Sequence, residues 1–114
     1  MSVNRELEMH AGDDLKIDVT VNDSSGDAVD ISAATVIIFG ISLVKRGATI
    51  FTKTLTAGIT ITNGPLGQLR ITLDAADTAG LNPRTYFHEL KVVISGERDT
   101  VLVGNFVLLE SILK

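Results

Sequence analysis

Two long β-branched runs near the C-terminus constrain the fold of this chain more than any other feature. The first run extends from Tyr86 to Ser95, the second from Thr100 to Leu109, and Gly96-Glu97-Arg98-Asp99 joins them. Two such runs joined by a short polar loop that contains Gly predict a β-hairpin. Side chains alternate between the two faces of a strand. One face of the first run therefore carries a set that we expect to line a core: Tyr86, His88, Leu90, Val92 and Ile94.

The rest of the chain repeats strand patterns at a spacing of roughly ten residues. Residues 15–21 and 68–73 alternate between apolar and polar side chains, and clusters of Gly, Asn, Asp and Ser separate the strands. Only Asp74 to Gly80 favours a short helical turn, with Asp74 as its cap and Gly80 at its end. The pattern predicts an all-β, antiparallel sandwich or small barrel of about seven to nine strands. We expect one domain over residues 1–114, with residues 1–11 as an N-terminal arm or edge strand.

The most apolar stretch, residues 34–44, has apolar side chains on both faces, so both faces need cover. Either it is a central strand covered on both faces within the domain, or its outer face meets another subunit. We assign Val36 and Ile38 to the core and the opposite face to contact with a second copy of the chain. The predicted interface residues are Ile37, Phe39, Ile41 and Leu43, with Val101, Val103 and Val107 as a second surface. Phe39→Asp is then expected to give a folded monomer. The predicted core residues are Leu15, Ile17, Val19, Val36, Ile38, Leu69, Ile71, Leu73, Tyr86, Leu90, Val92 and Ile94.

Composition excludes several classes of protein. The chain has a net charge of −4 and a pI near 5.0, and its ten Lys and Arg residues are scattered, so we expect no nucleic-acid partner. It has no cysteine, which excludes disulfides and thiolate metal sites. No apolar run reaches the length of a membrane span, and no apolar signal core is present at the N-terminus. The mean hydropathy of +0.31 is high for a small domain and indicates a partner surface.

Candidate catalytic and metal-binding patterns are weak. His10 and His88 are the only histidines, and neither belongs to a ligand or triad motif. We expect His10 to be exposed, and His88 to pack on the inner face of the hairpin with a hydrogen bond to a backbone carbonyl. The segment from Asp23 to Asp27 lacks the distal Glu of a calcium loop and is interpreted as a turn. We therefore expect no enzyme activity, no cofactor and no metal.

The segment from Asp74 to Tyr86 resembles the corner that precedes the sixth strand of immunoglobulin-type sandwiches. In that corner a tyrosine hydroxyl bonds to the backbone upstream, so the resemblance gives Tyr86 a structural role. Disulfide-bonded relatives place a Cys two residues after this tyrosine, where this chain has His88. The resemblance thus implies an immunoglobulin-like sandwich that depends on packing instead of a disulfide.

The order of features along the chain is similar to the immunoglobulin-like domains of tailed bacteriophages and prophages, as in upper baseplate proteins. The similarity covers Gly12 to Leu109. Its elements are Gly12-Asp13-Asp14, the turn from Asp23 to Asp27 before Val29-Asp30-Ile31-Ser32, Gly58-Ile59-Thr60-Ile61, Gly67-Gln68-Leu69, Leu73 to Asp77, Tyr86 to Leu90, Gly96 and Leu102 to Val107.

This resemblance implies a structural piece of a virion tail or baseplate that forms homo-oligomers and contacts other phage structural proteins. Its expected location is the virion, or the host cytoplasm during assembly. A carbohydrate- or receptor-binding module is the alternative. Sugar platforms use exposed aromatic rings, however, and this chain has no Trp, one Tyr and four Phe, which makes sugar binding the less favoured interpretation.

Overall fold

The structure is a computed structural model that describes residues 3–45 and 47–110. Nine strands form one sheet in the order β1-β9-β8-β4-β5-β6-β7-β3, and β2 also pairs with β9. The strands are β1 (Val3–Asn4), β2 (Leu7–His10), β3 (Leu15–Thr20), β4 (Ala34–Ser42), β5 (Thr49–Leu55), β6 (Gly58–Asn63), β7 (Gln68–Leu73), β8 (Arg84–Ile94) and β9 (Glu97–Leu109). One short helix, α1 (Ala75–Thr78), lies between β7 and β8.

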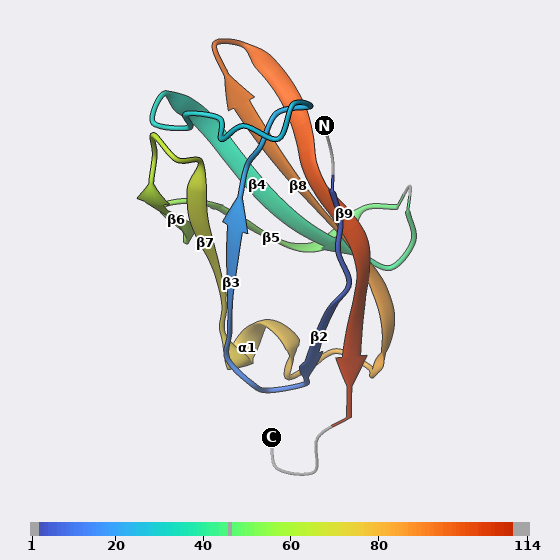
Figure 1. Cartoon of the computed structure of the whole chain (residues 1–114). Coiled ribbons are helices and arrows are strands. Elements are labelled where there is room, and N and C mark those ends of the chain that lie inside the picture. Colours follow the sequence, from blue (N-terminus) through green and yellow to red (C-terminus); the bar gives the residue numbers. More distant parts are fainter. Residues whose placement is uncertain (1–2, 46, 111–114) are drawn as a thin grey trace.

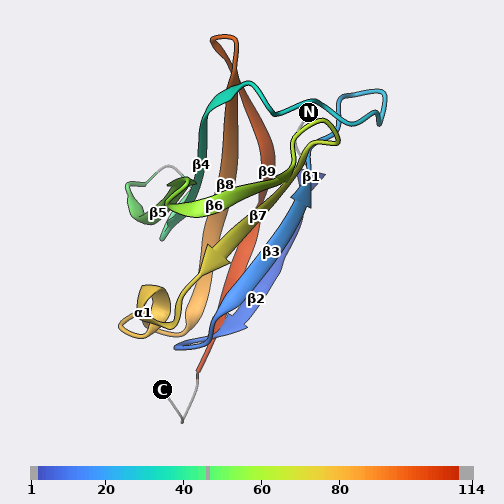
Figure 2. The same cartoon turned by 90° about the vertical axis from the view of Figure 1, so that its left-hand side faces the viewer.

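The sheet curls so that its two ends face each other, with β3 at one end and β1 and β2 at the other (Figures 1 and 2). The prediction of an all-β protein is confirmed. Most pairs are antiparallel, but β1 and β2 run parallel to β9, and β5 runs parallel to β6. The expectation of a purely antiparallel arrangement is wrong at these three contacts. Local alternation fixes the faces of a strand, whereas the direction of pairing depends on contacts between distant segments.

The β8–β9 hairpin is present, with a tighter turn than the sequence predicts. Ser95 and Gly96 alone form the turn, and both have positive φ angles, 52° and 82°. Two consecutive left-handed residues are typical of the type I′ turn, whose twist matches the twist of the flanking strands. Glu97 to Asp99 therefore belong to β9, not to the loop.

The segment between β7 and β8 is held by side-chain bonds to the backbone. The backbone N–H of Asp74 donates to the Asp77 carboxylate over 2.7 Å, and the N–H of Ala75 donates to the Asp14 carboxylate over 2.8 Å. The Tyr86 hydroxyl donates a 2.7 Å hydrogen bond to the carbonyl of Asn82, four residues upstream. These bonds fix the point at which the chain enters β8.

A single hydrophobic core lies inside the curled sheet. Most of the predicted core residues are buried there, and Leu15 and Ile94 are half-buried against it. Val36 and Ile38 are the exceptions, because they are 39% and 38% exposed on the outer side of β4. Their assignment to the core is wrong, and the alternate residues of β4 take their place. The correctly predicted buried residues are Ile17, Val19, Leu69, Ile71, Leu73, Tyr86, Leu90 and Val92.

Candidate functional site: the outer face of β4, β8 and β9

The side of β4, β8 and β9 that points away from the core forms a mixed surface, which we call the outer face. Along β8 it presents Phe87, Glu89, Lys91 and Val93, which alternate with buried residues. Directly opposite residues in a sheet share a face, so the strand register supplies the neighbours on both sides. On β4 these are Ser42, Gly40, Ile38 and Val36, and on β9 they are Asn105, Val103, Thr100 and Arg98.

Apolar side chains contribute much of this surface. Val36 and Ile38 are exposed on β4, and Phe87, Val93 and Val103 are half-buried beside them. The core beneath is formed by the inward residues of these strands, and Ile37, Phe39, Ile41, His88, Leu90 and Val92 are buried in it. These outward apolar side chains therefore contribute nothing to the core and remain available for another molecule.

A hollow of about 440 Å³ lies on the outer face. Gly40 on β4 contributes to its lining and leaves the outer face without a side chain at that position, whereas Gly104 on β9 lines it but pairs with the inward-facing His88. A Cβ atom placed at Gly40 would lie 3.0 Å from the methyl carbon of Thr49, which also lines the hollow. The other lining residues are Asn4, Ile38, Ser42, Lys45, Gly47, Phe87, His88, Glu89, Lys91, Val103 and Asn105.

The outer face also carries two opposite charges, Glu89 and Lys91, on consecutive outward positions of β8. The Thr100 hydroxyl donates to the Glu89 carboxylate over 3.4 Å. Neither charge forms a salt bridge within residues 3–45 and 47–110. At the edge of the hollow, the Lys45 ammonium lies 5.5 Å from the centre of the Phe87 ring. The surface thus combines apolar contact area with charges that are free to pair with another molecule.

The structure corrects the predicted interface on β4. Ile37, Phe39 and Ile41 are fully buried, so they cannot contact a second copy of the folded chain. Leu43 is exposed, but it lies beyond the end of β4. The assignment failed because both faces of residues 34–44 are apolar, which leaves no alternation to show which face is inward.

On β9 the predicted residues fall into different environments. Val101 is buried, whereas Val103 and Val107 are half-buried on the outer face. Sequence reasoning missed Gly40, Glu89 and Lys91 as parts of a surface. The one available signal was the alternation of β8, which already placed Phe87, Glu89 and Lys91 on the side opposite Tyr86 and Leu90.

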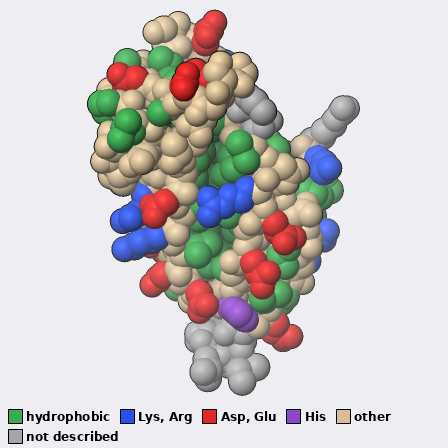
Figure 3. Space-filling model, viewed as in Figure 1, with side chains coloured by type: hydrophobic (Ala, Val, Ile, Leu, Met, Phe, Trp, Pro, Cys, Tyr) green, Lys and Arg blue, Asp and Glu red, His purple; other side chains and the backbone are tan. Residues whose placement is uncertain are grey.

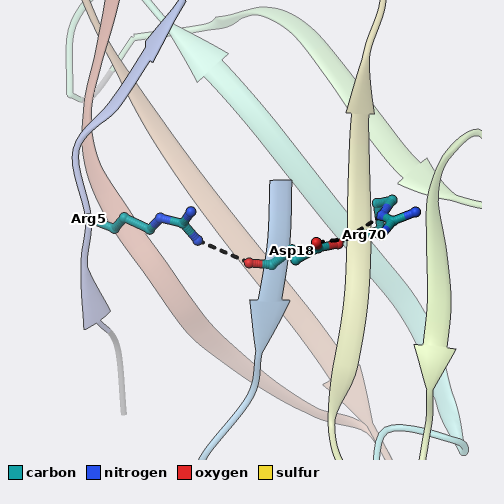
Figure 4. A network of polar contacts seen from close by, with 3 residues as sticks. All are labelled: Arg5, Asp18 and Arg70. Atoms are coloured by element: carbon teal, nitrogen blue, oxygen red, sulfur yellow. Dashed lines mark hydrogen bonds and ion pairs between the residues drawn. The ribbon is translucent and has the colours of Figure 1, made fainter. Parts of the chain in front are cut away.

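A second polar arrangement joins the two ends of the sheet. Arg5, between β1 and β2, reaches across to β3, where its Nη1 donates a 3.0 Å hydrogen bond to the carbonyl of Asp18. Figure 4 shows Arg5 and Arg70 on opposite sides of Asp18, and the Asp18 carboxylate lies 2.7 Å from the Arg70 guanidinium. That guanidinium holds the pKa of the Asp18 carboxyl below its usual value. Figure 3 shows apolar side chains between the two ends, with a basic side chain lying across them.

His88 bonds to the same residue, Arg5, from the core side of the sheet. It is 3% exposed, packs 5.7 Å from the Phe39 ring, and donates from Nε2 to the Arg5 carbonyl over 2.6 Å. The predicted inward packing and carbonyl bond of His88 are confirmed. Because a carbonyl accepts only, Nε2 carries the proton in the neutral ring. The other nitrogen, Nδ1, is buried with no hydrogen-bond partner among the described residues.

We expect His88 to make the fold sensitive to acid. Burial lowers the pKa of His88, the hydrogen bond to Arg5 opposes this, and the Arg5 charge adds to the lowering. The folded state therefore binds a proton less readily than the unfolded chain, whose His pKa is about 6.5. The free energy of unfolding should be constant above about pH 6.5 and fall as the pH drops below it.

Urea unfolding between about pH 7.5 and pH 5.5 measures this loss. The His88→Gln variant is the control, because it lacks the buried imidazole and retains His10 as an exposed histidine. Its stability should change less over the same range. An equal loss in both proteins would assign the acid sensitivity to other groups.

Comparison with known proteins finds no protein-family model that matches this chain and no match among curated proteins. Among the described residues, no group of three or more His, Asp or Glu side chains is arranged to hold a metal ion. None of the helical segments in the described ranges is long and apolar enough to cross a membrane.

Proposed function

We propose that this protein is a non-enzymatic structural protein that acts by assembly, and that it binds a second copy of itself through the outer face. The observation that carries this proposal is the exposure of Val36 and Ile38 on the side of β4 that points away from the core. Val36 and Ile38 are 39% and 38% exposed. Covering what remains exposed contributes that fraction of the value for full burial, roughly 0.6 to 1.2 kcal/mol each before the cost of association.

The same proposal places the protein in the tail or baseplate of a phage or prophage particle, in contact with other structural proteins of the particle. Its support is the order of sequence features that resembles immunoglobulin-like baseplate domains. The structure supports this resemblance at the coarser level of an all-β chain, whose nine strands form one curled sheet. The bond from Tyr86 to Asn82 occupies the corner that the resemblance indicates.

Light scattering coupled to size exclusion tests self-association. Between about 1 and 100 µM, the mass should exceed 12.1 kDa and fall on dilution. Ile38→Asp should give a folded monomer, because the charge would be buried in the contact. Leu66→Asp is the matched control, since Leu66 is 51% exposed in a loop and does not line the hollow. A wild-type monomer at every concentration contradicts the proposal.

The hollow favours one second candidate, a carbohydrate- or receptor-binding module. Lys45, Lys91 and Asn105 could pair with polar groups of a ligand beside the Phe87 ring. This candidate requires the outer face to be free in solution. A wild-type monomer that binds an immobilised glycan, and loses that binding in Lys91→Ala, would favour it over self-association.

A further inference from the structure

The outward side chains of β8 are complementary to those of a second β8 strand that runs in the opposite direction. Read from Phe87 to Val93, they are apolar, acidic, basic and apolar, and Leu90 lies at the midpoint with its side chain buried. When two such strands face each other in opposite directions about Leu90, each Glu89 meets a Lys91 and each Phe87 meets a Val93. A surface that complements itself in this way fits a two-fold axis, which places the same patch on both molecules.

The neighbouring strand β4 adds a complementary shape. Gly40 lies opposite Glu89, and Ile38 lies opposite Lys91. Consider a two-fold axis that lies between the two sheets, runs perpendicular to the strands and passes over Leu90 of β8. It stacks β4 of one copy on β4 of the other. It therefore sets Ile38 of each copy above Gly40 of the other, where Ile38 meets the methyl groups of Thr49 and Thr52 at the wall of the hollow. Sheets that pack face to face keep their strand directions within about 30°, so this alignment persists over the few residues concerned.

We propose that two copies of this chain pack outer face to outer face about this axis, with Ile38 of each copy in the hollow of the other and Glu89 against Lys91. The inference rests on the proposed self-association and specifies its geometry. The apolar contacts supply the binding energy. The charge pairs fix direction and register, because like charges would meet in the alternative arrangement with strands aligned in the same direction.

The size of the face sets the expected affinity. Three strands spaced by about 4.8 Å, over eight residues at about 3.3 Å each, cover roughly 380 Å² per copy. The total of about 760 Å² is below the size of a standard stable interface and is typical of a weak, reversible contact. The dimer should therefore dissociate in the micromolar range, within reach of a dilution series.

Charge exchange tests this axis without disturbing the core, because Glu89 and Lys91 are both exposed. Glu89→Lys and Lys91→Glu should each raise the dissociation constant about tenfold or more, since each variant opposes like charges twice. An equimolar mixture of the two variants should form a heterodimer, and the double variant E89K/K91E should regain the wild-type homodimer. Glu8→Lys and Lys16→Glu are matched controls on β2 and β3, and both should leave the mass unchanged.

The outcomes separate this geometry from the broader proposal. A wild-type monomer overturns both. A wild-type trimer, which has no two-fold axis, overturns the proposed axis and leaves self-association standing. The same holds if the single variants weaken the dimer but neither their mixture nor the double variant restores it. If the dissociation constant is unchanged in all of these variants, the contact does not involve Glu89 and Lys91, and the inference is overturned.

Discussion

Replacing Phe39 by alanine should lower the free energy of unfolding by about 3 to 5 kcal/mol, the range measured when a large buried aromatic side chain is removed. Phe39 is fully buried in the middle of β4 and packs against His88. Its loss leaves a cavity that the rigid sheet cannot close. Phe39→Asp should fail to fold, because it would bury an unpaired carboxylate. This replaces the expectation from sequence, which was a folded monomer.

Ile38→Ala is the control for Phe39→Ala, because Ile38 is the preceding residue on the same strand and points to the opposite face. Its effect on the unfolding of the monomer should be below about 1 kcal/mol. Urea unfolding at low protein concentration measures both variants. Equal losses would mean that the two faces of β4 are not divided between core and surface as the structure has them.

Gly104→Ala should destabilise the fold by more than about 2 kcal/mol, because the new methyl group would collide with backbone atoms. The nearest atoms to a Cβ at Gly104 are the carbonyl oxygen, the carbonyl carbon and the nitrogen of Arg5. None of these can move aside as the tip of a side chain would. The Arg5 carbonyl also accepts the His88 hydrogen bond, so displacing it would leave a buried imidazole N–H without a partner.

Gly80→Ala is the control for Gly104→Ala, since nothing lies within 4 Å of the added Cβ at Gly80. Its melting temperature should match that of the wild type, whereas Gly104→Ala should melt several degrees lower. If Gly104→Ala has the same melting temperature as the wild type, the Arg5 backbone packs less closely against Gly104 of β9 than its contacts indicate.

The sequence predicts strands well where one face is polar. In β3 and β7 the apolar residues alternate strictly, so Ile17 and Ile71 were correctly placed inside. In β4 both faces are apolar, so nothing local separates Phe39 from Ile38. The curl of the sheet decides between them, because only one face of β4 lies inside it. That curl depends on the pairing of all the strands.

The candidate site was only partly predictable for the same reason. The alternation of β8 places Glu89 and Lys91 on the surface, and this follows from local sequence. Their grouping with Ile38 and Gly40 requires the register between β4 and β8. The bond from Arg5 to Asp18 joins the two ends of the sheet order, and no pattern of spacing indicates it.

The parallel pairing of β1 and β2 with β9 has a consequence for synthesis of the protein. The N-terminal strands emerge from the ribosome first, but the strand beside which they lie is completed only with Leu109. The β6–β7 hairpin and its contact with β3 can form earlier, since they use nearby segments. Closing a loop of nearly the whole chain adds an entropic cost to the last step. Translation that stops before β9 should therefore yield an unfinished sheet whose N-terminal segment has no strand to join.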